Sequence, residues 1–120
     1  MNKALFLLSF TLSLNAADMG SLLFHGNCTT CHYELEDKSA PAMIKVQQKY
    51  KAAFGNKKEF VTYMSEWVAY PNAAHSIMQD AVEKYGLMPE LAFEKDVLQE
   101  ISSYIYETDF SKLHAGHKIK

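Results

Sequence analysis

HGNCTTCHYELE, residues 25–36, contains the only two cysteines of the 120-residue chain, Cys28 and Cys31, followed directly by His32. Several kinds of chemistry use a Cys-x-x-Cys spacing: a disulfide, a structural metal site, a redox-active dithiol and the covalent attachment of a larger group. The stretch alone does not choose among them, so the choice depends on the remainder of the sequence.

The first 16 residues, MNKALFLLSFTLSLNA, have the pattern of a secretory signal peptide. Lys3 gives a positive start, an apolar run follows, and small residues form the exit, so we expect cleavage after Ala16 or after Ala17. The apolar run is too short to span a bilayer. The sequence therefore predicts export to the periplasm without stable membrane insertion, one domain over residues 17–110 and a flexible tail over 111–120.

The charge pattern argues against nucleic-acid binding. The formal net charge is −2 and the chain contains no arginine, the residue that most often reads bases. Residues 61–110 are rich in acids, whereas residues 41–60 hold five lysines, namely Lys45, Lys49, Lys51, Lys57 and Lys58. These lysines are either an ordinary solvated surface or one end of a dipole that steers docking to a charged protein partner.

Apolar residues recur at helical spacing, and no segment alternates long enough to predict a sheet. We therefore expect an all-α fold of about four to five helices. The expected helices run from an Asp18 cap to about Asn27, from Ala42 to about Phe54, from Lys57 to Ala69, from an Asn72 cap through Ile77 and Val82 to Gly86, and from about Ala92 to Glu107.

This helical pattern decides what the cysteines are for. A redox dithiol of the thioredoxin kind requires a βαβ setting, and a structural zinc site requires four ligands, for which only His114 and His117 of the predicted tail are candidates. A disulfide across two residues closes too short a loop to stabilise much. Cys-x-x-Cys-His is the signature of covalent haem attachment, in which Cys28 and Cys31 form thioethers with the porphyrin and His32 ligates the iron. The predicted cofactor is one haem c.

The second axial position of the iron has several candidate ligands, namely Met43, Met64, Met78, Met88, His25 and His75. Methionines on apolar helix faces usually fill the core, and this applies to the first three. His25 is too near the attachment site to reach the other side of the ring, and His75 is expected at the surface. Met88 lies in the loop GLMPE just before Pro89, which stiffens the backbone. We therefore predict Met88 as the ligand, with Met78 and Met64 as alternatives.

With these residues the mature chain resembles the class I c-type cytochromes, which are small, hold one haem and ligate it through His and Met. CTTCH matches the attachment motif of that family, GLMPE its ligand loop, and FVTYMSEWVAYP the helix and proline before that loop. Gly20 and Phe24 match positions in the first helix of that family. Ile101 and Tyr104 match the positions of its last helix that pack across the first. The chain departs from the family pattern at Glu90, where a second proline is common, and in YELEDKSA, which lacks a glycine before Pro41.

The resemblance implies a cytochrome c-like bundle wrapped around one covalently bound haem. It also implies that the Pro41 carbonyl accepts a hydrogen bond from the ring of His32 and that Trp67 either donates to a haem propionate or belongs to the core. Cys28, Cys31, His32 and Met88 would hold the haem, with Pro41, Trp67 and Pro89 in its pocket.

The function implied is that of a soluble, monomeric electron carrier and not an enzyme. Such a protein passes single electrons between redox protein partners as its iron cycles between Fe(III) and Fe(II). Two alternatives stay open. One is a haem sensor with a labile sixth site, and the other is a haem subunit of a membrane oxidoreductase, with Trp67 and Tyr70 at the interface.

Overall fold

The computed structural model describes residues 16–112, and within them the chain is all-helical, as the sequence predicts. Its elements are α1 (Ala16–Asn27), α2 (Met43–Ala53), α3 (Lys57–Ala69), the 3-10 turn η1 (Ala73–His75), α4 (Gln79–Tyr85) and α5 (Lys95–Glu107). None of the helices in this range has the length and apolar character needed to cross a bilayer. The predicted signal peptide up to residue 15 and the tail from residue 113, with His114 and His117, lie outside the described residues.

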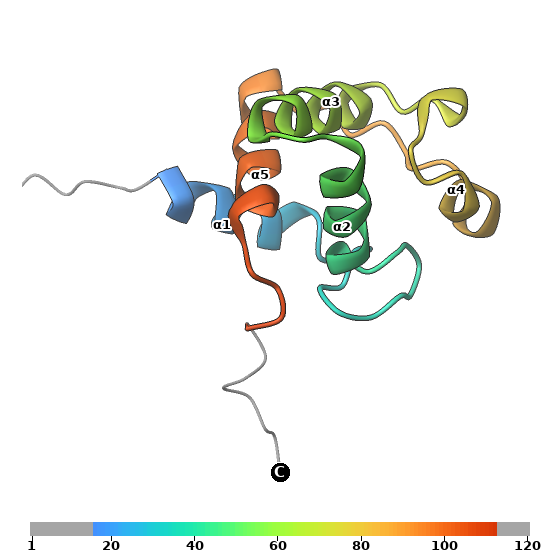
Figure 1. Cartoon of the computed structure of the whole chain (residues 1–120), viewed down its shortest axis with the longest axis horizontal. Helices are drawn as coiled ribbons and strands as arrows, with labels where there is room; N and C mark the ends of the chain where they lie inside the picture. Colours follow the sequence, from blue (N-terminus) through green and yellow to red (C-terminus); the bar gives the residue numbers. More distant parts are fainter. Residues whose placement is uncertain (1–15, 113–120) are drawn as a thin grey trace, which may run out of the picture.

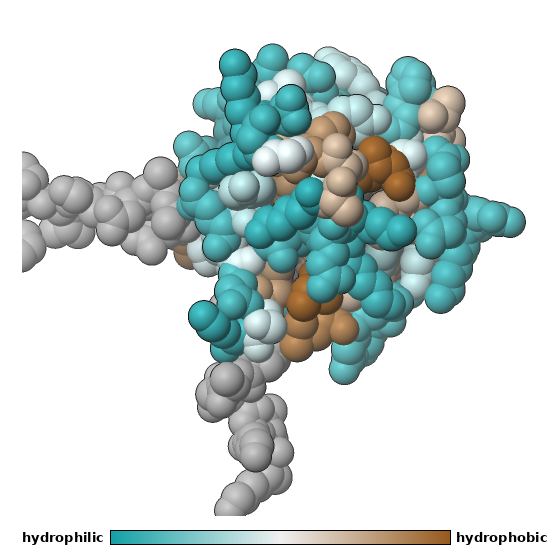
Figure 2. Space-filling view, viewed as in Figure 1, coloured by the Kyte–Doolittle hydropathy of each residue, from teal (hydrophilic) through white to brown (hydrophobic). Residues whose placement is uncertain are grey.

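Helix α5 is the element on which the others pack. It crosses both α1 and α3, and α2 lies beside it (Figure 1). Its Leu98, Ile101 and Ile105 are three or four residues apart, so they form one apolar stripe, and all three are buried. Phe24 of α1 and Phe60 of α3 are completely buried in the same core. By contrast, the outer face in Figure 2 is mostly hydrophilic, with apolar side chains in its recesses.

The crossing of α1 and α5 depends on Gly20. A Cβ atom on this residue would lie 2.8 Å from Cβ of Tyr104 and 2.9 Å from the carbonyl oxygen of Glu100. Carbon atoms do not approach so closely, so only glycine permits this helix separation. One turn later the ring of Phe24 packs on Tyr104 with 5.3 Å between ring centroids. The predicted contact of Gly20 and Phe24 with Tyr104 of the last helix is therefore confirmed.

Helix boundaries follow from local side-chain chemistry. The side chain of Asn56 accepts a hydrogen bond from the amide of Glu59 and caps α3, which has the predicted bounds. Gly86 ends α4 with φ of 83°, a conformation that favours glycine. Helix α1 begins at Ala16, so Asp18 lies inside the helix and is not its N-cap.

The single helix predicted from Asn72 to Gly86 is wrong. Asn72 caps only the short turn η1, accepting from the amide of Ala74 at 2.9 Å, and the chain is then extended at Ser76. The hydroxyl of Ser76 accepts from the amide of Met78 at 3.1 Å, which offers this backbone an alternative to a helical bond. A separate helix, α4, begins at Gln79.

Replacing Gly20 by alanine is expected to destabilise the chain by about 1–3 kcal/mol, because the added methyl group overlaps the backbone of α5 and Tyr104. Gly26 is the matched control in the same helix, since a Cβ there has no atom within 4 Å. Gly26→Ala should be neutral or stabilise by up to about 1 kcal/mol. Urea unfolding of the full chain measures both, and equal effects of the two substitutions would contradict this account of the crossing.

Gln47 is a buried polar residue that the sequence pattern did not single out. Its Nε2 donates to the carbonyls of Ile105 at 2.6 Å and Thr108 at 2.7 Å, at the C-terminal end of α5. Gln47→Met keeps most of the volume but leaves both carbonyls without this donor, so we expect a loss of about 1–3 kcal/mol. Gln48→Met, at an exposed position, is the control and should change the unfolding free energy little.

Candidate cofactor site

One cavity of about 250 Å³, partly open to solvent, lies between the helices. This volume lies just below the roughly 300–1,000 Å³ typical of small-molecule sites. The residues predicted from sequence as haem ligands and pocket residues, although far apart in the chain, all line it, namely Cys28, Cys31, His32, Pro41, Trp67, Met88 and Pro89. The fold therefore brings the whole predicted set to one place.

The two cysteines occupy the turn that follows α1. The amide of Cys28 donates to the carbonyl of Phe24 at 2.8 Å, and the amide of His32 donates to the carbonyl of Cys28 at 2.9 Å. Both cysteines are free thiols, with Cys28 half-buried and Cys31 exposed. Burial raises the pKa of Cys28 to about 11. The turn thus presents one thiol inside the cavity wall and one nearer to solvent.

His32 is held in one tautomer. Its Nδ1 lies 2.8 Å from the carbonyl oxygen of Pro41, and because a carbonyl only accepts, Nδ1 must carry the proton. Burial lowers the pKa of His32 below its usual value, and the bond to Pro41 offsets part of this effect. The imidazole is therefore neutral near pH 7 with its lone pair on Nε2, which is the form that binds a metal. The contact with Pro41 is the one that the family resemblance implied.

Four methionines line the cavity: Met43, Met64, Met78 and Met88. Met43 and Met64 are buried core residues of α2 and α3. Met78 was expected on a helix face, but it is the residue before α4 and lies outside any helix. Met88 is half-buried in the segment that follows Gly86. Met78 and Met88 are thus the two cavity-lining thioethers on non-helical backbone, so Met78 is a stronger alternative ligand than Met64.

Trp67 contributes its ring to the cavity wall but uses its N–H elsewhere. Nε1 donates to the carbonyl of Asn72 at 3.0 Å, which ties α3 to the start of η1. A propionate of a bound haem would have to compete with this carbonyl. In this structure the N–H of Trp67 is thus already engaged, and the residue lines the cavity wall.

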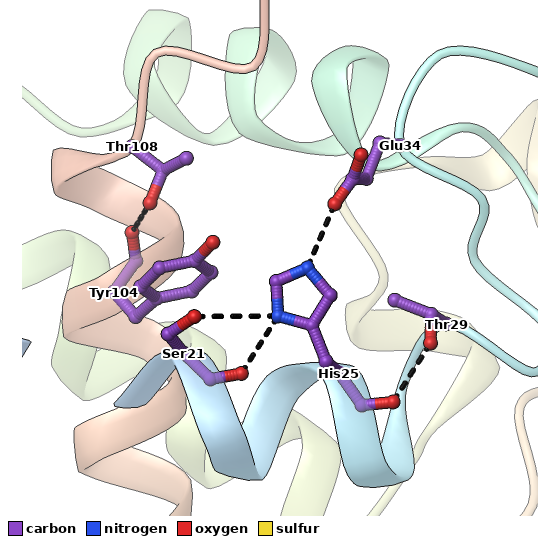
Figure 3. A network of polar contacts seen from close by, with 6 residues as sticks. All are labelled: Ser21, His25, Thr29, Glu34, Tyr104 and Thr108. Carbon is purple, nitrogen blue, oxygen red and sulfur yellow. Dashed lines mark hydrogen bonds and ion pairs between the residues drawn. The ribbon is translucent and has the colours of Figure 1, made fainter. Parts of the chain in front are cut away.

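His25 is engaged away from the cavity, as expected. Its Nε2 lies 2.9 Å from Oε1 of Glu34 and its Nδ1 lies 2.8 Å from the carbonyl of Ser21, while its ring packs near Tyr104 (Figure 3). His75 is exposed in η1 and does not line the cavity. Neither histidine is placed to be a second ligand.

The five predicted steering lysines do not form a uniform patch of free cations. Lys45 pairs with Asp37, Lys57 pairs with Glu107, and Lys51 lies over the ring of Tyr106. Lys49 and Lys58 are exposed and make no ion pair with any residue from 19 to 112. Steering by this surface would therefore depend mainly on these two.

Helix α4 contributes apolar side chains to one wall of the cavity. Ala81, Val82 and Tyr85 line the cavity, and no residue of α4 is buried. The helix makes its main contacts with η1 and stands at the side of the bundle (Figure 1). A group bound in the cavity would lie between α4 and the core. The apolar wall, the two thiols and the neutral imidazole of His32 are together suited to a covalently bound haem.

No protein-family model, no curated protein and no solved structure matches the chain. Within residues 19–112 no three His, Cys, Asp or Glu side chains cluster closely enough to hold a metal ion by themselves, and His114 and His117 lie outside this range.

The two thiols should differ in reactivity when no haem is attached. A pKa of about 11 in place of 9.0 lowers the thiolate fraction of Cys28 about 100-fold at a given pH below 9, so Cys28 in the folded chain should react much more slowly than exposed Cys31. Alkylation with iodoacetamide followed by peptide mass spectrometry measures both rates. In denaturant the two rates should converge. Equal rates in the folded chain would contradict the described burial of Cys28.

Proposed function

We propose that this chain is an exported monohaem c-type cytochrome that carries single electrons between redox protein partners and is not itself an enzyme. The observation that carries the proposal is the meeting of the CTTCH turn and the Met88 loop at one apolar cavity. The bound haem would supply one-electron chemistry through its iron.

Each protein group has a distinct task in this proposal. Cys28 and Cys31 would hold the porphyrin through thioether bonds and so keep the cofactor on the chain. His32, with its proton fixed on Nδ1, would have Nε2 free to bind the iron. Met88 is the proposed second axial ligand, and a thioether in that position raises the reduction potential relative to a second histidine.

The wall of the cavity would keep water away from the cofactor. Buried Met43 and Met64 and the side chains of α5 exclude water from one side of the site. A dry, close-packed wall holds the ligands in similar positions in both oxidation states. Cys31 is exposed, so the attached edge of a haem would lie near the surface, where a redox partner could dock through a small and weak interface. A periplasmic location agrees with the predicted signal peptide.

A haem sensor with a labile sixth site is the second candidate. One observation favours it: two methionines on non-helical backbone, Met78 and Met88, line the same cavity, so the sixth ligand could exchange between them. A ligand that is easily displaced would admit carbon monoxide near neutral pH. Rapid binding of carbon monoxide to the ferrous protein would therefore favour the sensor, whereas resistance favours the carrier.

The test is the optical spectrum of the full chain expressed with haem-attachment machinery. We expect the haem to stay on the chain after denaturation and to be absent from the Cys28→Ala, Cys31→Ala double variant. The ferric sulfur-to-iron band should disappear in Met88→Ala and persist in the matched control Met78→Ala. The opposite pattern would make Met78 the ligand, and a haem that leaves on denaturation would overturn the proposal.

A further inference from the structure

The peptide group between Pro41 and Ala42 is held from both sides. Its carbonyl accepts the hydrogen bond from Nδ1 of His32 at 2.8 Å. Its N–H donates to Oδ1 of Asp37 at 2.7 Å. A carboxylate is thus connected to the proposed axial imidazole through a single peptide unit and two short hydrogen bonds.

Asp37 is itself fixed in this position. Its second oxygen pairs with the ammonium group of Lys45, in the first turn of α2. The bond from the Ala42 amide, with a further contribution from Lys45, lowers the pKa of Asp37, so the group is ionised at neutral pH. Two backbone bonds close the same loop, from the amide of Met43 to the carbonyl of Tyr33 and from the amide of Ile44 to the carbonyl of Glu34.

The consequence follows from the polarisability of the peptide group. A negative acceptor on the N–H side draws the N–H proton and increases the negative charge on the carbonyl oxygen, and bonds linked in this way strengthen one another by roughly 10–30% each. The Pro41 carbonyl therefore becomes a better acceptor for Nδ1–H of His32. A stronger bond at Nδ1 makes Nε2 more electron-rich, and such a ligand favours ferric iron.

We propose that Asp37 is a positioning residue that, through the Pro41–Ala42 peptide, orients His32 and lowers the reduction potential of the iron it ligates. This inference rests on the proposed function, because it needs a haem on His32. Lys45 opposes the effect, since its positive charge neutralises part of the Asp37 carboxylate. Removing the charge of Asp37 and removing that of Lys45 should therefore shift the potential in opposite directions.

Four single variants of the full haem-bearing chain test this. Asp37→Asn removes the charge but keeps an oxygen that accepts from Ala42, and Lys45→Gln removes the counter-charge. Glu36→Gln and Lys49→Gln are the matched controls, because both residues are exposed and carry the same charges one and four positions away. Equilibrium redox titration gives the potential, and proton NMR of the ferrous form gives the resonance of the His32 Nδ1 proton.

We expect Asp37→Asn to favour reduction at least about threefold, or about 28 mV at 59 mV per tenfold for one electron, and Lys45→Gln to disfavour it. The controls should shift the potential less than half as much, and only Asp37→Asn should move the Nδ1 proton upfield. A shift in Asp37→Asn no larger than in Glu36→Gln, or an unchanged Nδ1 proton, overturns the inference.

Failure of the proposed function and failure of the role proposed for Asp37 give different results. A chain that never carries covalent haem refutes the proposed function and, with it, the effect on the potential. The NMR comparison of the chain as purified, wild type against Asp37→Asn and Glu36→Gln, still decides whether Asp37 positions His32. If the resonance of the His32 Nδ1 proton shifts in Asp37→Asn alone, the positioning role of Asp37 stands. If the resonance shifts in neither variant, that role is refuted.

Discussion

The close crossing of α1 and α5 at Gly20 is the constraint on which the site depends. Because no Cβ fits between Gly20 and the backbone of α5, the two helices approach to a distance that only glycine permits. The turn with Cys28, Cys31 and His32 follows α1 directly, so this crossing fixes where the turn meets the core. Helices α2 and α3 then close the wall of the cavity around it.

A second set of contacts fixes the chemistry of the turn. The neutral imidazole of His32 has one proton position because Pro41 accepts it, and Pro41 lies in a loop that Asp37 ties to the start of α2. The loop over residues 33–42 contains no regular secondary structure, and its backbone bonds to Met43 and Ile44 hold it in place. The proton position of His32 is thus set by a loop and not by a helix.

Much of this architecture could be predicted from local patterns. The bounds of α3 followed from the apolar stripe and from Pro71 after it, and Cys28, Cys31, His32, Met88 and Pro89 of the cavity lining followed from the CTTCH and GLMPE motifs. The interruption at Ser76 could not, because a serine hydroxyl that binds Met78 in place of the helix leaves the apolar spacing unchanged. Gln47 and Asp37 were also missed, since their roles depend on partners in other segments, and in sequence each is an ordinary polar residue.

The central claim is that the cysteine pair is an attachment site for a single haem held by His32. Intact-mass measurement under denaturing conditions, combined with thiol alkylation, tests it most directly. We expect a chain that is heavier by the mass of one haem and has no alkylatable cysteine. The peptide that contains Cys28 and Cys31 should still carry the haem. A chain of unmodified mass with two alkylatable thiols, purified from cells that attach haem, would contradict it.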